Sequence, residues 1–214
     1  MLLDSIEWLG HSGFRIDARG ATIYIDPYRI PDGPTADLIL VTHGHYDHYS
    51  PQDVERVSGG HTWLVAPPAV AERAGGRVAS IAPGQQLELE PVPGVEVLGV
   101  AAYNTSKRDE DGRPFHPRDA GGVGFELNVR GERLYHAGDT DVIPEMDQVV
   151  GVDLALLPVS GTYVMTASEA AEAARRIQPA MAVPMHWGEH IGTREDAEEF
   201  AERATVPVTI MDPA

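Results

Sequence analysis

The chain of 214 residues contains no cysteine. Disulfides, thiolate metal ligands, cysteine-ligated iron–sulfur clusters and cysteine nucleophiles are therefore excluded. Any transition-metal site must be built mainly from histidine and carboxylate side chains. At roughly 150 residues per domain the length favours one domain, which we expect to span residues 1–214. A chain of this size buries about 70% of its unfolded surface, so it needs no disulfide or structural metal to fold.

Positive charge is also scarce. The chain has 16 basic and 33 acidic residues, a formal net charge of −17, and Lys107 is its only lysine. An acidic surface repels phosphate backbones and anionic lipids, so neither nucleic acid nor membrane is an expected partner. The sequence has no apolar run long enough to span a bilayer, and its acidic start does not resemble a signal peptide. We therefore expect a cytoplasmic protein with a small-molecule substrate, and a homo-oligomer is compatible with the sequence.

Short apolar segments separated by turn residues predict many strands. The predicted strands are 6–9, 13–17, 21–25, 38–42, 61–66, 77–81, 86–90, 95–101, 123–129, 133–136, 154–157, 180–184 and 206–211. Capping signals predict helices over 51–57, 68–74, 167–177 and 194–204. Residues 104–121 form one long polar loop, which in a compact domain is usually functional or mobile. These elements favour a layered sheet structure with helices outside.

The decisive feature is a histidine-rich segment directly after a continuous apolar strand. His43, His45, Asp47 and His48 provide four possible metal ligands within six residues, and Gly44 permits a tight turn between them. In an extended backbone His43 and His45 lie on the same side, whereas Asp47 and His48 can reach a second point. The group suits two closely spaced divalent cations better than one.

The pattern His-x-His-x-Asp-His after a buried strand resembles the signature of the metallo-β-lactamase superfamily of binuclear hydrolases. Three further segments extend the resemblance. Residues 8–12 followed by 25–27 resemble the opening of the ascorbate-phosphate-lactonase-like branch, 136–140 resemble the strand end with the bridging aspartate, and 184–188 resemble the strand end with the last histidine. The resemblance covers residues 5 to about 210. It implies an α/β fold, a four-layer αββα sandwich in a single domain.

The resemblance also implies roles for individual residues. The implied ligands are His43 and His45 for a first metal ion, Asp47, His48 and His186 for a second, and Asp139 as the bridge between them. Asp47 and Asp139 are the carboxylates expected to take part in catalysis. A shared carboxylate partly neutralises two cations held about 4 Å apart. Zinc is the expected metal for imidazole and carboxylate ligands, and manganese or iron would fit the same set.

The sequence departs from the superfamily at the third ligand of the first metal. The position where a histidine is usual, after the strand 95–103, is occupied by Asn104. Asn104 could offer a weak amide oxygen, and His116 could swing in from the loop 104–121. Since imidazole is the stronger ligand for zinc, we favour His116. A third alternative is a first site that is under-coordinated and binds its metal weakly.

Other polar residues are expected near the site. His11 and Asp26 lie at strand ends and could orient ligand imidazoles, although a turn histidine and a strand-terminating Asp-Pro are equally consistent. Ser160, in a turn after strand 154–157, could donate a hydrogen bond to substrate. His136 is either an orienting residue or a plain buried histidine. The remaining histidines, His61 and His190, are expected in structural or surface positions.

These residues together predict a metal-dependent hydrolase. A hydroxide bridging two metal ions would attack a carbonyl or phosphorus centre of a small polar substrate, a lactone or a phosphodiester. The sequence has no Gly-x-Ser-x-Gly elbow, Walker loop or dinucleotide fingerprint. One alternative is a nuclease of the same superfamily, which the net charge disfavours. The other is a non-catalytic metal-binding domain. It requires that the first site holds no metal ion because Asn104 replaces the usual histidine.

Overall fold

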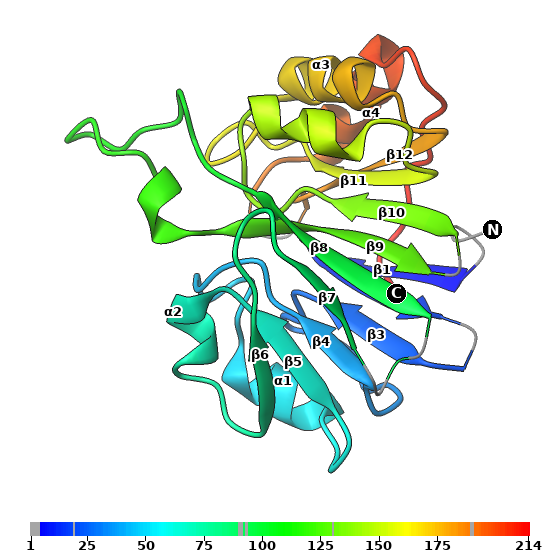
Figure 1. Ribbon diagram of the computed structural model, residues 1–214. Coiled ribbons are helices and arrows are strands. Elements are labelled where there is room, and N and C mark those ends of the chain that lie inside the picture. The colour runs from blue at the N-terminus through cyan, green and yellow to red at the C-terminus, as the bar shows by residue number, and fades with distance from the viewer. Residues whose placement is uncertain (1–4, 19, 90–91, 93, 130, 189–190) are drawn as a thin grey trace.

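The computed structural model describes residues 5–18, 20–89, 92, 94–129, 131–188 and 191–214. The described residues form two six-stranded sheets packed face to face, with helices on both outer faces (Figure 1). The predicted αββα sandwich is therefore confirmed. The predicted surface histidine His190, the turn residue Arg130 and the strand residue Glu90 lie outside the described residues.

The first sheet is formed by the N-terminal strands in sequence order. It contains β1 (Ile6–Gly10), β2 (Gly13–Asp17), β3 (Thr22–Ile25), β4 (Leu38–Leu40), β5 (Trp63–Ala66) and β6 (Arg77–Ser80). The short helices α1 (Pro51–Val57) and α2 (Pro68–Ala71) follow β4 and β5. The pairs β1–β2 and β2–β3 are antiparallel, and the pairs from β3 to β6 are parallel.

The second sheet is formed by the later strands. Its order is β12 (Met181–Met185), β11 (Leu154–Pro158), β10 (Glu132–His136), β9 (Val123–Val129), β8 (Val95–Ala101) and β7 (Gln86–Glu88). Its outer face carries α3 (Ala167–Ile177) and α4 (Arg194–Arg203) (Figure 1). Two 3₁₀ helices, η2 (Arg118–Ala120) and η3 (Pro144–Val149), complete the described elements with assigned bounds. No helix among the described residues is long and apolar enough to cross a membrane.

Strand β3 shows how the sequence separates the layers. Ile23 and Ile25 point into the central core between the two sheets. Tyr24, between them, points to the opposite face, where it packs in one cluster with Val57 of α1 and Val70 of α2. Successive strand residues point to opposite faces, so an unbroken apolar strand requires cover on both sides. The helices supply that cover.

One predicted strand is wrong. Residues 206–211 do not form a strand, and only Val208 makes an isolated bridge, to Ala182 of β12. The backbone N–H of Ala182 donates to the carbonyl of Pro207, and the Ala182 carbonyl accepts from the N–H of Thr209. The ladder cannot extend in either direction, because Pro207 on one side and Pro184 of β12 on the other have no N–H to donate to the next bond. The alternation of apolar residues, which predicted this strand, does not show whether its backbone can pair with a neighbouring strand.

The predicted strand 38–42 ends two residues early, and this end positions the site. The chain leaves the first sheet after Val41, whose N–H still donates to the Val65 carbonyl of β5 at 3.0 Å. The backbone N–H of Thr42 donates to Asp26 Oδ1 at 2.8 Å, and the Thr42 carbonyl accepts from Val123 of β9 at 3.0 Å. Thr42 therefore joins the two sheets, and His43 directly follows this junction.

Candidate metal centre

Eight histidine and aspartate side chains converge where the strands of both sheets end. Their ligand atoms form groups whose members lie within 4.8 Å of one another. The groups are His43, His45 and His116; His11, Asp47, His48 and His186; and His43, His48 and Asp139. We call the first the His116 group and the second the His186 group. Every ligand that the sequence predicted, except Asn104, belongs to one of these groups.

Asp139 lies between the two groups and contacts both. Its Oδ2 is 3.3 Å from His116 Nε2 and 3.2 Å from His186 Nε2. Its Oδ1 is 3.3 Å from His48 Nε2, and its Oδ2 is 4.0 Å from His43 Nε2. The carboxylate is almost fully buried, at 4% exposure. Asp139 therefore connects the two groups of candidate ligands.

Three of the converging or adjoining residues have a left-handed backbone. The φ angles are +51° at His11, +45° at Asp26 and +59° at His186. Non-glycine residues rarely adopt this region, and where they do so the strain is often found at functional sites. At His11 and His186 the two turns support each other, since the N–H of His186 donates to the carbonyl of His11 at 2.8 Å.

Asp26 orients the ring of His48, which is one of the two roles that the sequence left open for it. Its Oδ2 is 2.7 Å from His48 Nδ1 and also accepts the hydroxyl of Thr42 at 2.6 Å. Both Asp26 and His48 are fully buried. With Nδ1 bound to a carboxylate, His48 presents Nε2 to Asp139. A carboxylate behind a histidine in this way fixes its tautomer and strengthens it as a ligand.

Hydroxyl groups hold two further rings in the same manner. The Oγ of Ser160 is 2.9 Å from His186 Nδ1, and the Oγ1 of Thr42 is 3.0 Å from His43 Nδ1. Ser160 therefore lies behind a candidate ligand, where it contacts His186. The sequence analysis did not identify Thr42 as a residue that orients a ligand. Its position directly before His43 was the only signal for this role.

Asn104 lies behind His116, not beside the other ligands. Its Oδ1 accepts from the backbone N–H of His116 at 2.8 Å and lies 3.0 Å from His116 Nδ1. Its Nδ2 donates to Asp141 Oδ1 at 3.2 Å and to the Tyr163 carbonyl at 2.9 Å. The amide oxygen that was considered as a metal ligand is thus occupied by His116. The Nε2 of His116 points into the centre, 3.2 Å from His45 Nδ1.

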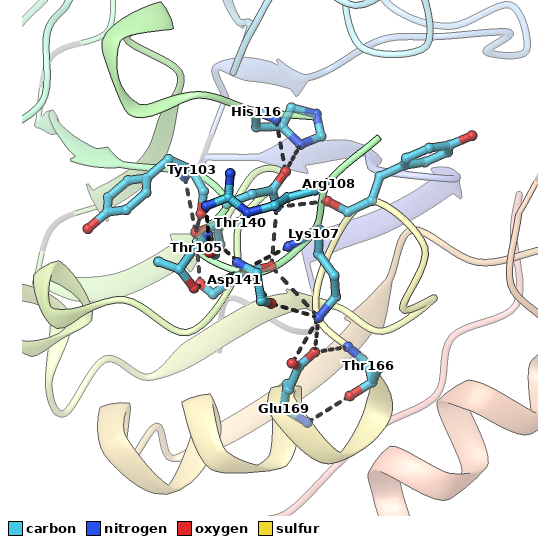
Figure 2. A network of polar contacts seen from close by, with 12 residues as sticks. Tyr103, Thr105, Lys107, Arg108, His116, Thr140, Asp141, Thr166 and Glu169 are labelled. Atoms are coloured by element: carbon cyan, nitrogen blue, oxygen red, sulfur yellow. Dashed lines mark hydrogen bonds and ion pairs between the residues drawn. The ribbon is translucent and has the colours of Figure 1, made fainter. Parts of the chain in front are cut away.

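A network of polar contacts fastens the start of the loop 104–121 (Figure 2). Asp141 Oδ2 accepts from the backbone N–H groups of Thr105 and Ser106 at 2.8 and 2.6 Å and from both of their hydroxyls. Lys107 Nζ contacts Glu169 at 2.6 Å, and Glu169 also completes the capping box with Thr166 at the start of α3. These contacts connect the loop to α3, a helix on the outer face of the second sheet. Sequence reasoning found the capping box but not Asp141.

His11 lies closer to the centre than the sequence indicated. Orienting a ligand and filling a turn were the two roles that the sequence left open for it, but its Nε2 lies 3.2 Å from Asp47 Oδ2 and within the His186 group. His136 is a buried structural histidine, with Nε2 2.9 Å from the Ser12 carbonyl and Nδ1 accepting from the N–H of Gly138. The exposed His61 contacts Asp37 at the surface, as expected.

Burial and mutual charge shift the pKa values of the central groups. Burial lowers the pKa of His43 well below 6.5, and the neighbouring His48 adds to this. Burial alone would raise the pKa of Asp139, but His186 and His48 outweigh it and hold the value well below 3.8. Burial also opposes ionisation of Asp47, yet its hydrogen bond to His11 lowers the Asp47 pKa to about 2. The carboxylates are therefore charged at neutral pH.

The donor set fits divalent cations. Among the described residues, His48 Nε2, His186 Nε2 and Asp139 Oδ1 are buried side-chain atoms without a hydrogen bond of regular geometry. Buried polar atoms normally have such a partner, and a divalent cation held between the two histidines and Asp139 would supply one for each of the three atoms. Imidazole nitrogens and carboxylate oxygens suit zinc, iron and manganese.

Comparisons with known proteins agree with this geometry. Residues 5–186 match the model of a family described as the beta-lactamase superfamily domain. A UPF0173 metal-dependent hydrolase from Methanopyrus kandleri is 34% identical, and the alignment covers 97% of this chain and 96% of that protein. A crystal structure from Parabacteroides distasonis, assigned as a metal-dependent hydrolase, is 30% identical with a TM-score of 0.85, covering 98% of this chain and 93% of that one.

The fold is shared more widely. Igni18, a metallo hydrolase from Ignicoccus hospitalis, is 24% identical and has a TM-score of 0.78, covering 98% of this chain and 95% of that one. The family match, the relatives' names and the convergent ligand groups agree. The chain belongs to the beta-lactamase superfamily domain family and is a metal-dependent hydrolase of the metallo-β-lactamase superfamily.

Proposed function

We propose that the enzyme works with two divalent cations, zinc being the first candidate, and hydrolyses a small polar substrate, a lactone or a phosphodiester. The observation that carries this proposal is the place of Asp139. One buried carboxylate lies within 3.3 Å of imidazoles from both the His116 group and the His186 group. Two cations, one in each group, would use all eight side chains, and a carboxylate placed between them can serve both.

The chain's own residues would hold the two cations separately. His43, His45 and His116 would bind the first, and Asp139 would join it to the second. His48, Asp47 and His186 would bind the second, with His11 as a further donor. The non-catalytic alternative required a first site without a third imidazole, and His116 argues against it. Bound divalent cations would supply Lewis acidity, which acidifies water and polarises a carbonyl or phosphoryl oxygen.

The buried partners behind the ligands keep this geometry ready for reaction. Asp26, Ser160 and Asn104 each fix the Nδ1 side of one histidine ring, so its Nε2 stays directed inward. Preorganised charges need little rearrangement as the transition state forms, and that is the main source of electrostatic catalysis.

Metal analysis together with one variant tests the proposal. Protein purified without added metal should contain two divalent cations per chain, and it should hydrolyse members of a panel of lactones and phosphodiesters. Asp139→Ala should bind fewer than two cations and lose all measurable hydrolysis. Asp147→Ala, which removes an exposed carboxylate bonded to Arg176, is the matched control and should keep both properties. Full activity of Asp139→Ala, or a single cation in the active wild type, would contradict the binuclear mechanism.

A further inference from the structure

A cavity of about 160 Å³ opens directly beside the His116 group. His43, His45, His116 and Asp139 form one wall. The remaining walls come from the segment around α2 and from the loop before β9, and include Pro67, Ala69, Val70, Phe115, Ala120 and Val123. A substrate whose electrophilic atom reaches Asp139 from this side must place its neighbouring atoms among these side chains.

These walls offer no polar recognition. Apart from the candidate metal ligands, none of the described lining residues has a side-chain hydrogen-bond donor or acceptor. Arg73, whose guanidinium packs near Gly44 and over Tyr49, lines a separate cavity. A hydroxyl or phosphate oxygen placed against these side chains would leave water without gaining a side-chain partner from them, which costs binding energy. An alkyl group would instead gain from leaving water.

A larger cavity of about 390 Å³ adjoins the other side of the centre. It touches His11 and is lined partly by Tyr28, Arg29 and Trp187. Asp139 and the His116 group are absent from its described lining. The apolar cavity is therefore the one that meets the shared carboxylate.

We propose that the substrate is a neutral lactone with a short alkyl substituent, and that Ala69 and Phe115 determine this specificity. This inference rests on the proposed hydrolase function and narrows its substrate class. Polyhydroxylated lactones and phosphodiesters are disfavoured. The cavity holds on the order of ten water-sized groups, enough for a small ring carrying a few carbons.

The reaction is balanced by water alone. Hydrolysis forms a bond between the water oxygen and the carbonyl carbon and breaks the bond from that carbon to the ring oxygen. The ring oxygen takes one proton and becomes a hydroxyl, and the new carboxylic acid releases its proton at neutral pH. No oxidation or reduction occurs, and the alkyl substituent is unchanged.

Substrate preference provides the first test. The metal-loaded enzyme is assayed with γ-butyrolactone, its γ-methyl, γ-ethyl and γ-propyl derivatives, a polyhydroxylated γ-lactone and bis(4-nitrophenyl) phosphate. Burying one methylene is worth about 0.8 kcal/mol, so kcat/KM should rise about fourfold per added carbon until the cavity is filled. The polyhydroxylated lactone and the phosphodiester should be the poorest substrates.

Substitutions in the cavity test whether Ala69 and Phe115 determine the preference for an alkyl substituent. Ala69→Leu fills the cavity and should reduce kcat/KM for the γ-propyl lactone at least tenfold while changing that of γ-butyrolactone much less. Phe115→Ala enlarges the cavity and should move the optimum to a longer substituent. Ala71→Leu is the matched control, because Ala71 lies in the same short helix but not among the cavity residues, and it should leave the preference unchanged.

Binding without turnover gives an independent readout. The corresponding γ-alkyl lactams resist hydrolysis, and calorimetry should show tighter binding and a more negative heat-capacity change with each added carbon. A preference for the hydroxylated lactone or the phosphodiester, or equal loss on all substrates in Ala69→Leu, would overturn this inference and leave the hydrolase proposal standing. Failure of the two-metal protein to hydrolyse any lactone or phosphodiester would overturn both.

Discussion

Asn104 determines which nitrogen of His116 faces the centre. Its two amide hydrogens are used by Asp141 and Tyr163, so the oxygen must accept from His116 Nδ1–H. That leaves the Nε2 lone pair free to bind a cation. A buried amide with every group satisfied resists rotation, because each alternative orientation would lose several hydrogen bonds.

Asn104→Ala should therefore weaken metal binding in the His116 group while sparing the other group. Loss of such a partner behind a ligand typically lowers metal affinity by about 10–100-fold. Zinc content measured after equilibration at a series of free zinc concentrations should fall from two per chain to about one in the intermediate range. Asn128→Ala, on β9, is the matched control and should bind two. Equal affinities in Asn104→Ala and wild type would contradict the role assigned to Asn104.

The segment from Asn104 to Lys107 depends on one carboxylate for its conformation. Three backbone N–H groups, those of residues 105–107, and two hydroxyls donate to Asp141, and the Lys107 side chain continues the contact to Glu169 of α3. Burial raises the pKa of Asp141, but the donors of Ser106 and Thr105 outweigh it and hold it below the usual 3.8. The charged form is therefore stabilised more in the folded chain than in the unfolded chain.

This shift sets the sign of a pH effect. The stabilisation by ionised Asp141 is fully present above the unfolded pKa and is lost as the pH falls through the lower folded value. Asp141→Asn should reduce the free energy of unfolding by about 1–3 kcal/mol at pH 7. Denaturant unfolding at a series of pH values should show this difference shrinking below about pH 4. The exposed Asp119→Asn is the control, and a difference that grows on acidification would contradict the explanation.

Helix α3 is the element to which the loop is tied. Thr166 accepts from the N–H of Glu169, and Glu169 accepts from the N–H of Thr166. Thr166→Ala should cost about 1 kcal/mol, seen as a lower melting temperature by about 2–4 °C. Ser168→Ala, an exposed substitution in the same turn, is the control and should change stability by less than about 0.5 kcal/mol. Equal effects of the two substitutions would show that the capping box contributes nothing.

The candidate metal centre lies where the two sheets of the molecule meet, and both sheets contribute ligands to it. His43, His48 and the other ligands after β4 come from the first sheet, whereas Asp139 and His186 follow β10 and β12 of the second. Cations bound between them would connect the two layers. Cations that bind these histidines in the folded chain, and not in the unfolded chain, shift the unfolding equilibrium toward the folded state. Removing the cations removes that stabilisation.

Removing metal should therefore lower the melting temperature. A site saturated at 100 times its dissociation constant contributes about 2.7 kcal/mol, which corresponds to about 5–10 °C for a chain of this size. Scanning calorimetry after chelation and dialysis should show this decrease, and added zinc should reverse it more fully than magnesium, which prefers oxygen ligands. Asp139→Ala should show a smaller shift, and identical curves with and without metal would contradict a centre that joins the sheets.

Local patterns predicted most of the fold. Strands β2, β8 and β9 and the start of α3 occur where alternation and capping residues placed them, because those signals reflect contacts within or between adjacent turns. The strand predicted at 206–211 was wrong because ladder formation there depends on Pro207 and its neighbour β12. Whether a segment pairs with the edge strand of a sheet depends on the tertiary structure, so the periodicity of apolar residues does not predict it.

Sequence alone determined the kinds of chemistry available. Without cysteine, the metal ligands had to be imidazoles and carboxylates, and the His-x-His-x-Asp-His segment placed four of them after one strand. Tertiary structure decided which distant side chains join them. His11, His116 and Asp139 lie far apart along the chain, and only the packing of two sheets brings their atoms together. The separate roles of Asn104 and His116 also depended on the fold, because a hydrogen bond requires a particular distance and direction that spacing along the chain does not specify.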